Sequence, residues 1–331
     1  MEISMQKGLV SIITPCYNSG RYIHRLLDSV LMQDYPSIEM FTIDDGSTDN
    51  TKQIIESYIP KFQEKGHQLT YIYQENAGQA AAVNRGLKLV TGEFLTWPDS
   101  DDYYRYPNSI STMTKCLSSS NKDFGLVRCQ CRFLEEDTLL ELDGKIEYTD
   151  CDSLFMPFIK GEEFGGGAGL YMVKTEALDK TITGRDIYTK RGAQNCQLLL
   201  PSFYSYKCKT INDCLINILV RSISHSRTVK SYEGQLDDIQ SYIDIFANTL
   251  NRMKKLSSGE KEECLHYVNL RFLNDKISLA LNFARYGDAR MFARQFKNIG
   301  GILNRGKQVK LLLSWCPPLL KIANWLHKNI A

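Results

Sequence analysis

The chain has 331 residues, 43% of them hydrophobic, and a formal net charge of +2 at neutral pH. This size and composition fit one large or two modest globular domains with a hydrophobic core. The sequence has no run of 18 apolar residues that would predict a membrane-spanning helix, and its basic residues form no nucleic-acid recognition motif.

The N-terminal residues and the cysteines favour a cytoplasmic protein. Residues 1–7 lack the apolar segment of a secretory signal peptide, and a predicted strand follows them directly. Ten cysteines are scattered without a Cys-x-x-Cys pair, which favours reduced thiols over a disulfide framework. We therefore expect a cytoplasmic location, either free or peripheral on the inner face of the cell membrane.

The first hundred residues alternate predicted strands and helices. Short apolar runs indicate the strands, and apolar residues at three- and four-residue spacing indicate the helices. The predicted strands span 9–15, 39–43, 69–73 and a run from Phe94, and the predicted helices span 22–33, a segment beginning near 49–51, and 78–89. This alternation is typical of an α/β protein with a largely parallel sheet and right-handed crossovers.

The pattern becomes less regular after about residue 105 and helical from about residue 230. The predicted strands of the middle section span 124–129 and 170–173, and the later helices span 232–253 and 260–286. A serine- and glycine-containing break at 257–259 separates the two helices. We therefore expect an α/β domain over 1–228 and a helical region over 229–331.

A cluster of carboxylates follows the fourth predicted strand. Asp99 and Asp101 are two residues apart, so their side chains project to the same side of an extended chain. Two carboxylates this close repel each other unless they share a cation, and Mg²⁺ or Mn²⁺ binds carboxylates together with phosphate oxygens. The segment predicts a metal–diphosphate site, and an acidic turn that caps the next helix is the simpler alternative.

Polar clusters also follow the first three predicted strands. They are Pro15-Cys16-Tyr17-Asn18, Asp44-Asp45-Gly46-Ser47 and Glu75-Asn76-Ala77-Gly78-Gln79. The carboxyl ends of parallel strands lie along one edge of a sheet, where α/β proteins bind their ligands. One polar ligand could contact all four clusters, which makes four unrelated polar turns the weaker account.

These segments, in this order, resemble a family-2 glycosyltransferase of the capsule or cell-surface polysaccharide type. The likeness covers about the first 110 residues closely and the next 120 loosely. It implies the GT-A fold, a Rossmann-like nucleotide-sugar-binding domain with a mostly parallel mixed sheet, here with a C-terminal helical extension. It also implies inverting transfer of a sugar from a nucleotide-diphosphate sugar, by default a UDP-sugar, to a hydroxyl group of a saccharide.

The resemblance implies a nucleotide-sugar site at the strand ends. Tyr17 would stack near the nucleobase beside Pro15, since an aromatic face suits a flat base. Asp45 would accept a hydrogen bond from a uracil-type imide, with Asp44 supporting the turn. Other nucleotide-sugar contacts would come from Asn76, Gly78, Asn84, Asp99 and Ser100, with Asn84 bracing the loop of Asn76 and Gly78.

The resemblance also implies a metal cofactor, Mn²⁺ or Mg²⁺. Asp101 would bind the metal, which stabilises the negative charge that develops on the departing nucleoside diphosphate. Val220 to Ser226 resembles a late segment of the family that folds back over the active site. Arg221 of this segment could neutralise the diphosphate, and His225 could be a further metal ligand, although a single histidine is more often structural.

The chain departs from the family where a pair of acids usually begins a helix past the glycine-rich region. Gln194 and Asn195 occupy this place, and an amide cannot accept a proton near neutral pH. Asp186, Glu162 and Glu163 are candidate bases only by their nearness in sequence. Gln194 and Asn195 could orient the acceptor or a water molecule, or could cap a helix.

The C-terminal segment 305–328 combines Leu, Trp and basic residues, and no acidic residue follows Asp288. Such segments lie in the plane of a membrane surface, where anionic lipids attract basic residues. Packing of the same apolar residues on the protein is an equally good interpretation. A lipid-linked saccharide acceptor would favour contact with the membrane.

Two other functions remain open. A catalytically silent nucleotide-sugar-binding or scaffold subunit would explain the missing acids at 194–195. A sugar nucleotidyltransferase would share the fold group, but the loop at 15–20 lacks the glycine-rich basic sequence that such an enzyme needs. The nucleotide-sugar and saccharide partners are therefore expected for an enzyme, and nucleic acid is not.

Overall fold

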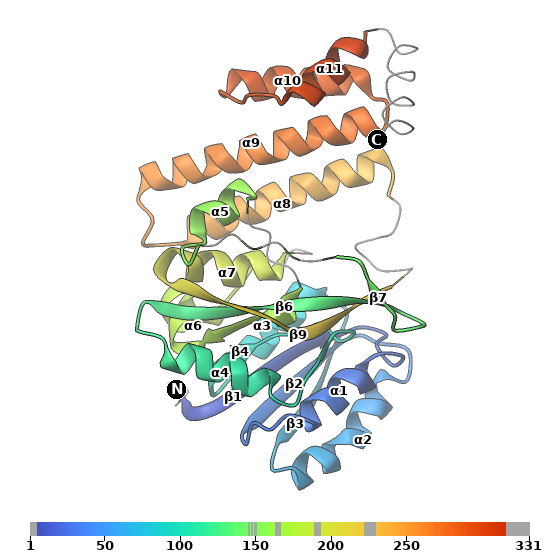
Figure 1. Ribbon diagram of the computed structural model, residues 1–331, viewed down its shortest axis with the longest axis vertical. Coiled ribbons are helices and arrows are strands. Elements are labelled where there is room, and N and C mark those ends of the chain that lie inside the picture. The colour runs from blue at the N-terminus through green and yellow to red at the C-terminus, as the bar shows by residue number, and fades with distance from the viewer. Residues whose placement is uncertain are drawn as a thin grey trace. The chain divides into compact units, whose positions relative to one another are not determined.

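The computed structural model describes residues 5–144, 146, 148, 151–162, 167–188, 193–221 and 230–315. The chain divides into two compact units, Met1–Arg227 and Thr228–Ala331. The first unit is an α/β domain and the second is helical (Figure 1).

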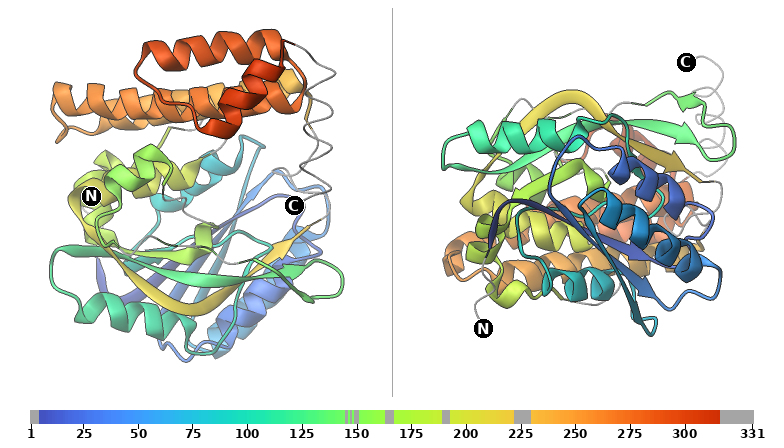
Figure 2. Two further views of the ribbon diagram at one scale, coloured as in Figure 1. Left: turned by 45° about the horizontal axis from the view of Figure 1, so that its top comes forward. Right: turned by 90° about the horizontal axis from the view of Figure 1, so that it is seen from below.

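The first half of the α/β unit alternates strands and helices, as the sequence predicts. Its elements are β1 (Gln6–Cys16), α1 (Ile23–Leu31), β2 (Ile38–Asp45), α2 (Thr51–Glu64), β3 (Gln68–Gln74), α3 (Gln79–Leu87) and β4 (Gly92–Thr96). The four strands pair in parallel in the order β3-β2-β1-β4. α1 and α2 lie side by side against this half of the sheet (Figures 1 and 2).

The second half of the unit extends the same sheet with mixed pairing. Its elements are β5 (Tyr103–Tyr104), α4 (Ser109–Ser119), β6 (Phe124–Glu135), β7 (Glu141–Leu142), α5 (Phe155–Lys160), η1 (Ala168–Leu170), β8 (Tyr171–Lys174), α6 (Thr175–Thr181), η2 (Thr183–Arg185), α7 (Gln194–Ser205) and β9 (Lys207–Val220). β8 is antiparallel to both β4 and β6, whereas β6 and β9 run parallel as long neighbouring ribbons (Figure 2). The antiparallel strand β8 therefore interrupts the parallel pairing between β4 and β6, and the predicted α/β class is confirmed.

The core of the sheet is buried on both faces. Val10, Ile12 and Ile13 of β1 have no exposed surface, and α3 approaches β1 so closely that a Cβ on Gly86 would lie 2.6 Å from Ile13. A glycine at this helical position therefore lets α3 pack directly onto the strand. Helices covering both faces explain why β1 and β2 are apolar runs without strict alternation.

The sheet also contains a buried carboxylate near the amino ends of its central strands. Glu39 is 5% exposed, and its oxygens accept hydrogen bonds from Thr91 N (2.7 Å), Thr91 Oγ1 (2.9 Å), Gly92 N (3.1 Å) and Ser11 Oγ. A carboxylate that satisfies several donors is retained in a core because its removal leaves those donors unpaired. Glu39 therefore ties β1 and β2 to the start of β4.

The helical unit contains α8 (Tyr232–Arg252), α9 (Ser258–Asn282), α10 (Tyr286–Asn298) and α11 (Arg305–Leu313). A capping box between Ser257 and Glu260 starts α9 at the predicted break. The predicted helix 260–286 is wrong at its end, because α9 stops at Asn282 and Ala284 has a positive φ of 54°. No helix within the described ranges is long and apolar enough to cross a membrane.

Candidate active site

Four polar loops meet at the carboxyl edge of the parallel half of the sheet. They follow β1, β2, β3 and β4, which are neighbours in the sheet (Figure 1). Parallel pairing brings their carboxyl ends to one edge, so segments far apart in the sequence become adjacent. Hydrogen bonds between these loops show that the predicted clusters form a single polar site.

The loops after β1 and β2 bond to each other through Asn18. Asn18 N donates to Ser47 Oγ (2.9 Å), and Asn18 Oδ1 accepts from Thr48 N (2.8 Å). Asn18 has a φ of 48°, a conformation that asparagine tolerates better than most residues. Tyr17 immediately precedes it and is 45% exposed, so its ring is accessible at this edge.

Asp45 organises the loop between β3 and α3. Its carboxylate accepts hydrogen bonds from Gln74 Nε2, Ala77 N and Gly78 N, each at 2.8 Å, and its backbone carbonyl accepts one from Asn76 Nδ2 (2.9 Å). The side chain is buried, and Gly78 has a φ of 96° that favours glycine. The structure therefore brings Asp45, Asn76 and Gly78 together, with Asp45 as the centre of the turn.

The acidic loop after β4 contacts two of its neighbours. Asp99 Oδ1 accepts a hydrogen bond from Gln79 Nε2 (2.6 Å), and Ser100 Oγ lies 2.7 Å from Ser19 Oγ of the loop after β1. Arg221, at the end of β9, places its Nε 2.8 Å from Asp101 Oδ2. An ion pair thus connects the two halves of the sheet at the acidic loop.

The electrostatics of this loop are those of crowded carboxylates. Burial and the neighbouring Asp101 carboxylate raise the pKa of Asp99 to about 7, and the same causes raise the pKa of Asp102 well above its usual range. Burial, followed by the charges of Asp44, Asp49 and Asp101, raises the pKa of the Cys16 thiol beneath the loop. The site favours a cation, since positive charge would relieve this repulsion.

The donor set fits a divalent cation only in part. The described residues contain no group of three or more histidine, cysteine or acidic side chains that could hold a metal ion. Mg²⁺ and Mn²⁺ often use one or two carboxylates and complete their shell with phosphate oxygens and water. Asp99 and Asp101 suit such a substrate-completed site, whereas His225 lies outside the described residues.

Gln194 and Asn195 begin α7 rather than cap it. The helix follows Ala193, whose φ of 51° turns the chain, and no side-chain hydrogen bond caps its N-terminus. Gln194 is buried, and Asn195 Oδ1 accepts a hydrogen bond from Trp97 Nε1 (2.8 Å). The helix-capping alternative is therefore wrong, and α7 is tied to the segment between β4 and Asp99.

The side chain of Asn84 braces a different segment from the one predicted. Asn84 Oδ1 accepts from Ile187 N (2.9 Å), and its Nδ2 donates to Asp186 Oδ1 (3.2 Å). The Asp186 side chain is 52% exposed and pairs with Lys88 at 3.4 Å. These partners hold Asp186 in an exposed ion pair beside α3. Glu162 is exposed, and Glu163 lies outside the described residues.

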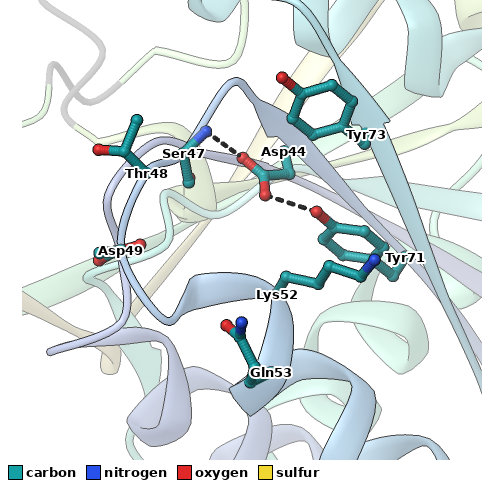
Figure 3. Close-up of a pocket in the computed structure, with 8 residues that line it drawn as sticks. All are labelled: Asp44, Ser47, Thr48, Asp49, Lys52, Gln53, Tyr71 and Tyr73. Atoms are coloured by element: carbon teal, nitrogen blue, oxygen red, sulfur yellow. Dashed lines mark hydrogen bonds between the residues drawn. The ribbon is translucent and has the colours of Figure 1, made fainter.

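A pocket of about 420 Å³ lies beside the Asp45 turn, along β2, β3 and the start of α2. Asp44 accepts hydrogen bonds there from Ser47 N (2.8 Å) and Tyr71 Oη (2.7 Å), as Figure 3 shows. The other residues that line the pocket are Thr48, Asp49, Lys52, Gln53 and Tyr73. The sequence did not predict these lining residues as site residues, although the alternation of Tyr71 and Tyr73 on one strand face was a usable signal.

Comparison with known proteins shows a family likeness over the first half of the chain. Residues 11–162 match the family model described as glycosyl transferase family 2. An uncharacterized glycosyltransferase of Rickettsia typhi is 39% identical over 137 residues, which are 41% of this chain and 40% of that protein. Glycosyltransferase GlyG of Streptococcus pneumoniae is 30% identical over 157 residues, 47% of this chain and 45% of that protein.

A third relative is TuaG of Bacillus subtilis, which is named for teichuronic acid biosynthesis. It is 42% identical over 99 residues, which are 30% of this chain and 38% of that protein. The chain thus spans less than half of the length of each of these three relatives.

Solved structures extend the likeness to most of the chain. TarS residues 1–349 of S. aureus, in complex with UDP-GlcNAc, align with a TM-score of 0.59 and 19% identity over 92% of this chain and 79% of that one. The mannosyltransferase PcManGT of Pyrobaculum calidifontis, in complex with GDP-Man and Mn²⁺, aligns with a TM-score of 0.55 and 18% identity over 98% of this chain and 89% of that one. These likenesses confirm the predicted GT-A fold.

Proposed function

We propose that this protein, whose residues 11–162 match the model of glycosyl transferase family 2, transfers a sugar from a UDP-sugar to a saccharide hydroxyl group with inversion. The observation that carries the proposal is the joined set of loops at the carboxyl edge of the sheet. Asn18 and Ser19 reach the loops after β2 and β4, and Gln79 reaches Asp99. One extended anionic ligand would contact all of these loops.

The nucleotide would bind at the ends of β1 and β2. Tyr17 is exposed there and offers an aromatic face to a base. Asp45 has three hydrogen-bond donors on its carboxylate, and a carboxylate has about four acceptor positions. One position is therefore left for the imide N–H of a uracil ring, and a UDP-sugar is the donor that this arrangement favours.

The diphosphate would bind between Asp101 and Arg221. When bound to Asp99 and Asp101, Mn²⁺ or Mg²⁺ would supply positive charge where the leaving diphosphate gains negative charge. The Arg221 guanidinium lies 2.8 Å from Asp101. Once a metal neutralises that carboxylate, the guanidinium could pair with a phosphate oxygen instead. His225 remains a predicted further ligand.

The acceptor would be a lipid-linked saccharide used in cell-surface polysaccharide synthesis. The relative named for teichuronic acid biosynthesis supports a polymer of this kind. The helical unit supports a membrane surface as a partner, because Leu311 packs on its core while Leu312 and Trp315 are 71% and 75% exposed. Arg290 lies 4.2 Å from the Trp315 ring, which keeps a basic group beside the exposed indole.

The proposal is tested by donor turnover. The full chain is mixed with Mn²⁺ and a panel of UDP-, GDP- and dTDP-sugars, and nucleoside diphosphate release and donor binding by calorimetry are followed with and without EDTA. We expect one donor to bind and to be hydrolysed slowly in a metal-dependent manner. Absence of both binding and release across the panel would exclude the function.

A silent nucleotide-sugar-binding subunit is the second candidate. One observation favours it: the first turn of α7 presents Gln194 and Asn195 instead of the pair of acids that family members usually carry. Such a subunit would bind a donor in the calorimeter but release no diphosphate, with or without saccharide acceptors. An enzyme would show release that increases when its acceptor is added.

A further inference from the structure

A hydrogen bond between Trp97 and Asn195 determines which way the asparagine amide faces. Trp97 is 1% exposed, and its Nε1 lies 2.8 Å from Asn195 Oδ1. An indole N–H can only donate a hydrogen bond, so its partner must be the amide oxygen and not the amide nitrogen. The Asn195 NH₂ group therefore points away from the indole, and the side chain is only partly buried.

The position of this pair links it to the candidate active site. Trp97 directly follows β4, and only Pro98 separates it from Asp99. Asn195 lies in the first turn of α7, at the position where the family resemblance implies an acid. A residue held by the segment that leads into the acidic loop keeps a fixed position relative to that loop.

We propose that Asn195 is a hydrogen-bond donor to an oxygen of the saccharide acceptor, and that Trp97 is the positioning residue that orients it. This inference rests on the proposed glycosyltransferase function. The proton of the attacking hydroxyl goes to another group, because an amide has no basic atom near neutral pH. No bond forms or breaks at Asn195.

Charge explains why an amide suits this position. An aspartate at 195 would accept the same hydrogen bond from Trp97, so the contact alone does not select asparagine. It would also add a negative charge close to a segment that already carries Asp99, Asp101 and Asp102. Asparagine keeps the contact, avoids the charge and offers two N–H donors to the substrate.

The first test is a double-mutant cycle on the full chain with Trp97→Phe and Asn195→Ala. Each single variant should lower kcat for transfer to the acceptor by about tenfold or more, as expected for the loss or misplacement of one aligned donor. The double variant should be no worse than the poorer single variant, since both changes remove the same hydrogen bond. Additive losses, or unchanged kcat in both single variants, would overturn the inference.

Binding separates positioning from general damage to the fold. Calorimetric titration with the nucleotide-sugar donor should give the same Kd for the wild type and for both single variants, because neither side chain is assigned to the donor. A parallel loss of donor binding would mean that Trp97 acts only by supporting the acidic loop. If the wild type itself binds no donor, the proposed function fails instead.

Asn195→Asp gives a test that is independent of the stability of Trp97→Phe. It preserves the side-chain volume and the Trp97 contact, and it should reduce transfer by about tenfold or more. Asn251→Asp, an exposed change at the end of α8, is the matched control and should leave transfer unchanged. A rise in kcat for Asn195→Asp, with a new carboxylate pKa in its pH profile, would show that position 195 serves a base and would refute the donor role.

Discussion

Carboxylates lie at both ends of the parallel half of the sheet, but in opposite surroundings: Glu39 is buried at the amino end, whereas Asp99 and Asp101 are half-buried at the carboxyl end. At the amino end, Glu39 accepts hydrogen bonds from Ser11, Thr91 and Gly92. At the carboxyl end, Asp99 and Asp101 lie beside further acids. Gln79 donates a hydrogen bond to Asp99, and Arg221 pairs with Asp101.

The comparison distinguishes a carboxylate that the protein's own donors satisfy from carboxylates whose charge a ligand would balance. Glu39 is surrounded by the protein's own donors, so its charge is compensated without a ligand and its loss should affect stability. At the carboxyl end, burial and then the charge of Asp101 raise the pKa values of Asp99 and Asp102. Strongly perturbed acids in one loop are typical of functional sites, where a ligand completes the charge balance.

The largest expected effect is on catalysis at the carboxyl end. Asp101→Ala should reduce metal-dependent transfer by about 10³-fold or more, because a metal contributes several kcal/mol of charge stabilisation in the transition state. The measurement is kcat/KM with saturating Mn²⁺. Asp213→Ala, an exposed change on β9, is the control, and equal activity of Asp101→Ala and wild type would contradict a metal role for this residue.

At the amino end of the strands, a substitution should change the stability of the fold and not catalysis. Glu39→Ala should lower the free energy of unfolding by about 3 kcal/mol, because buried donors at Ser11, Thr91 and Gly92 would lose their acceptor. Urea denaturation followed by circular dichroism measures the loss. A change below about 0.5 kcal/mol would show that water replaces the carboxylate without cost, and the contrast between the two ends would disappear.

The pH dependence of Mn²⁺ binding should reveal the crowding at Asp99. Its pKa is raised to about 7 in the folded chain, so protons compete with the cation below that pH. We expect Mn²⁺ affinity, measured by calorimetry without donor, to change little from pH 8 to 7 and to fall by up to about tenfold from pH 7 to 6. Asp99→Asn should bind more weakly and without this step.

As the pH rises, the free energy of unfolding of the metal-free protein should fall, whereas the affinity for the metal should increase. A carboxyl group whose folded pKa lies above its unfolded value favours folding in its protonated form. The metal-free protein should therefore lose the contribution of Asp99 as the pH rises from about 4 through 7. Thermal unfolding of Asp99→Asn without metal should lack this part of the pH dependence, and an unchanged profile would count against the raised pKa.

The smallest predicted effect concerns one donor to Glu39. Ser11→Ala removes a hydroxyl that donates to the carboxylate and accepts from Gly92 N (2.9 Å), while Glu39 keeps its bonds to Thr91 and Gly92. The free energy of unfolding should fall by about 1 kcal/mol, the usual net contribution of one hydrogen bond. A loss as large as that of Glu39→Ala would mean that Ser11, and not Glu39, organises this end.

Much of the fold was predictable because the local patterns agree with it. Apolar runs ending in polar clusters located β1 to β4, and helical spacing located α1 and α3, with ends within a few residues of those observed. The end of α9 was not predictable, because apolar residues continue past Asn282 while Ala284 adopts a positive φ that periodicity does not encode. The antiparallel position of β8 between β4 and β6 is likewise a tertiary outcome.

The sequence by itself determined the chemistry of the strand ends, because residue type and spacing place Asp45 at the end of one parallel strand and Asp99 shortly after another. Only the tertiary structure decided the partners of these side chains. Asn84 bonds to Ile187 instead of the Asn76 loop, and Asn195 bonds to Trp97 across 98 positions of sequence. Spacing along one strand is local and periodic, whereas a contact between β4 and α7 depends on how the sheet and its helices pack.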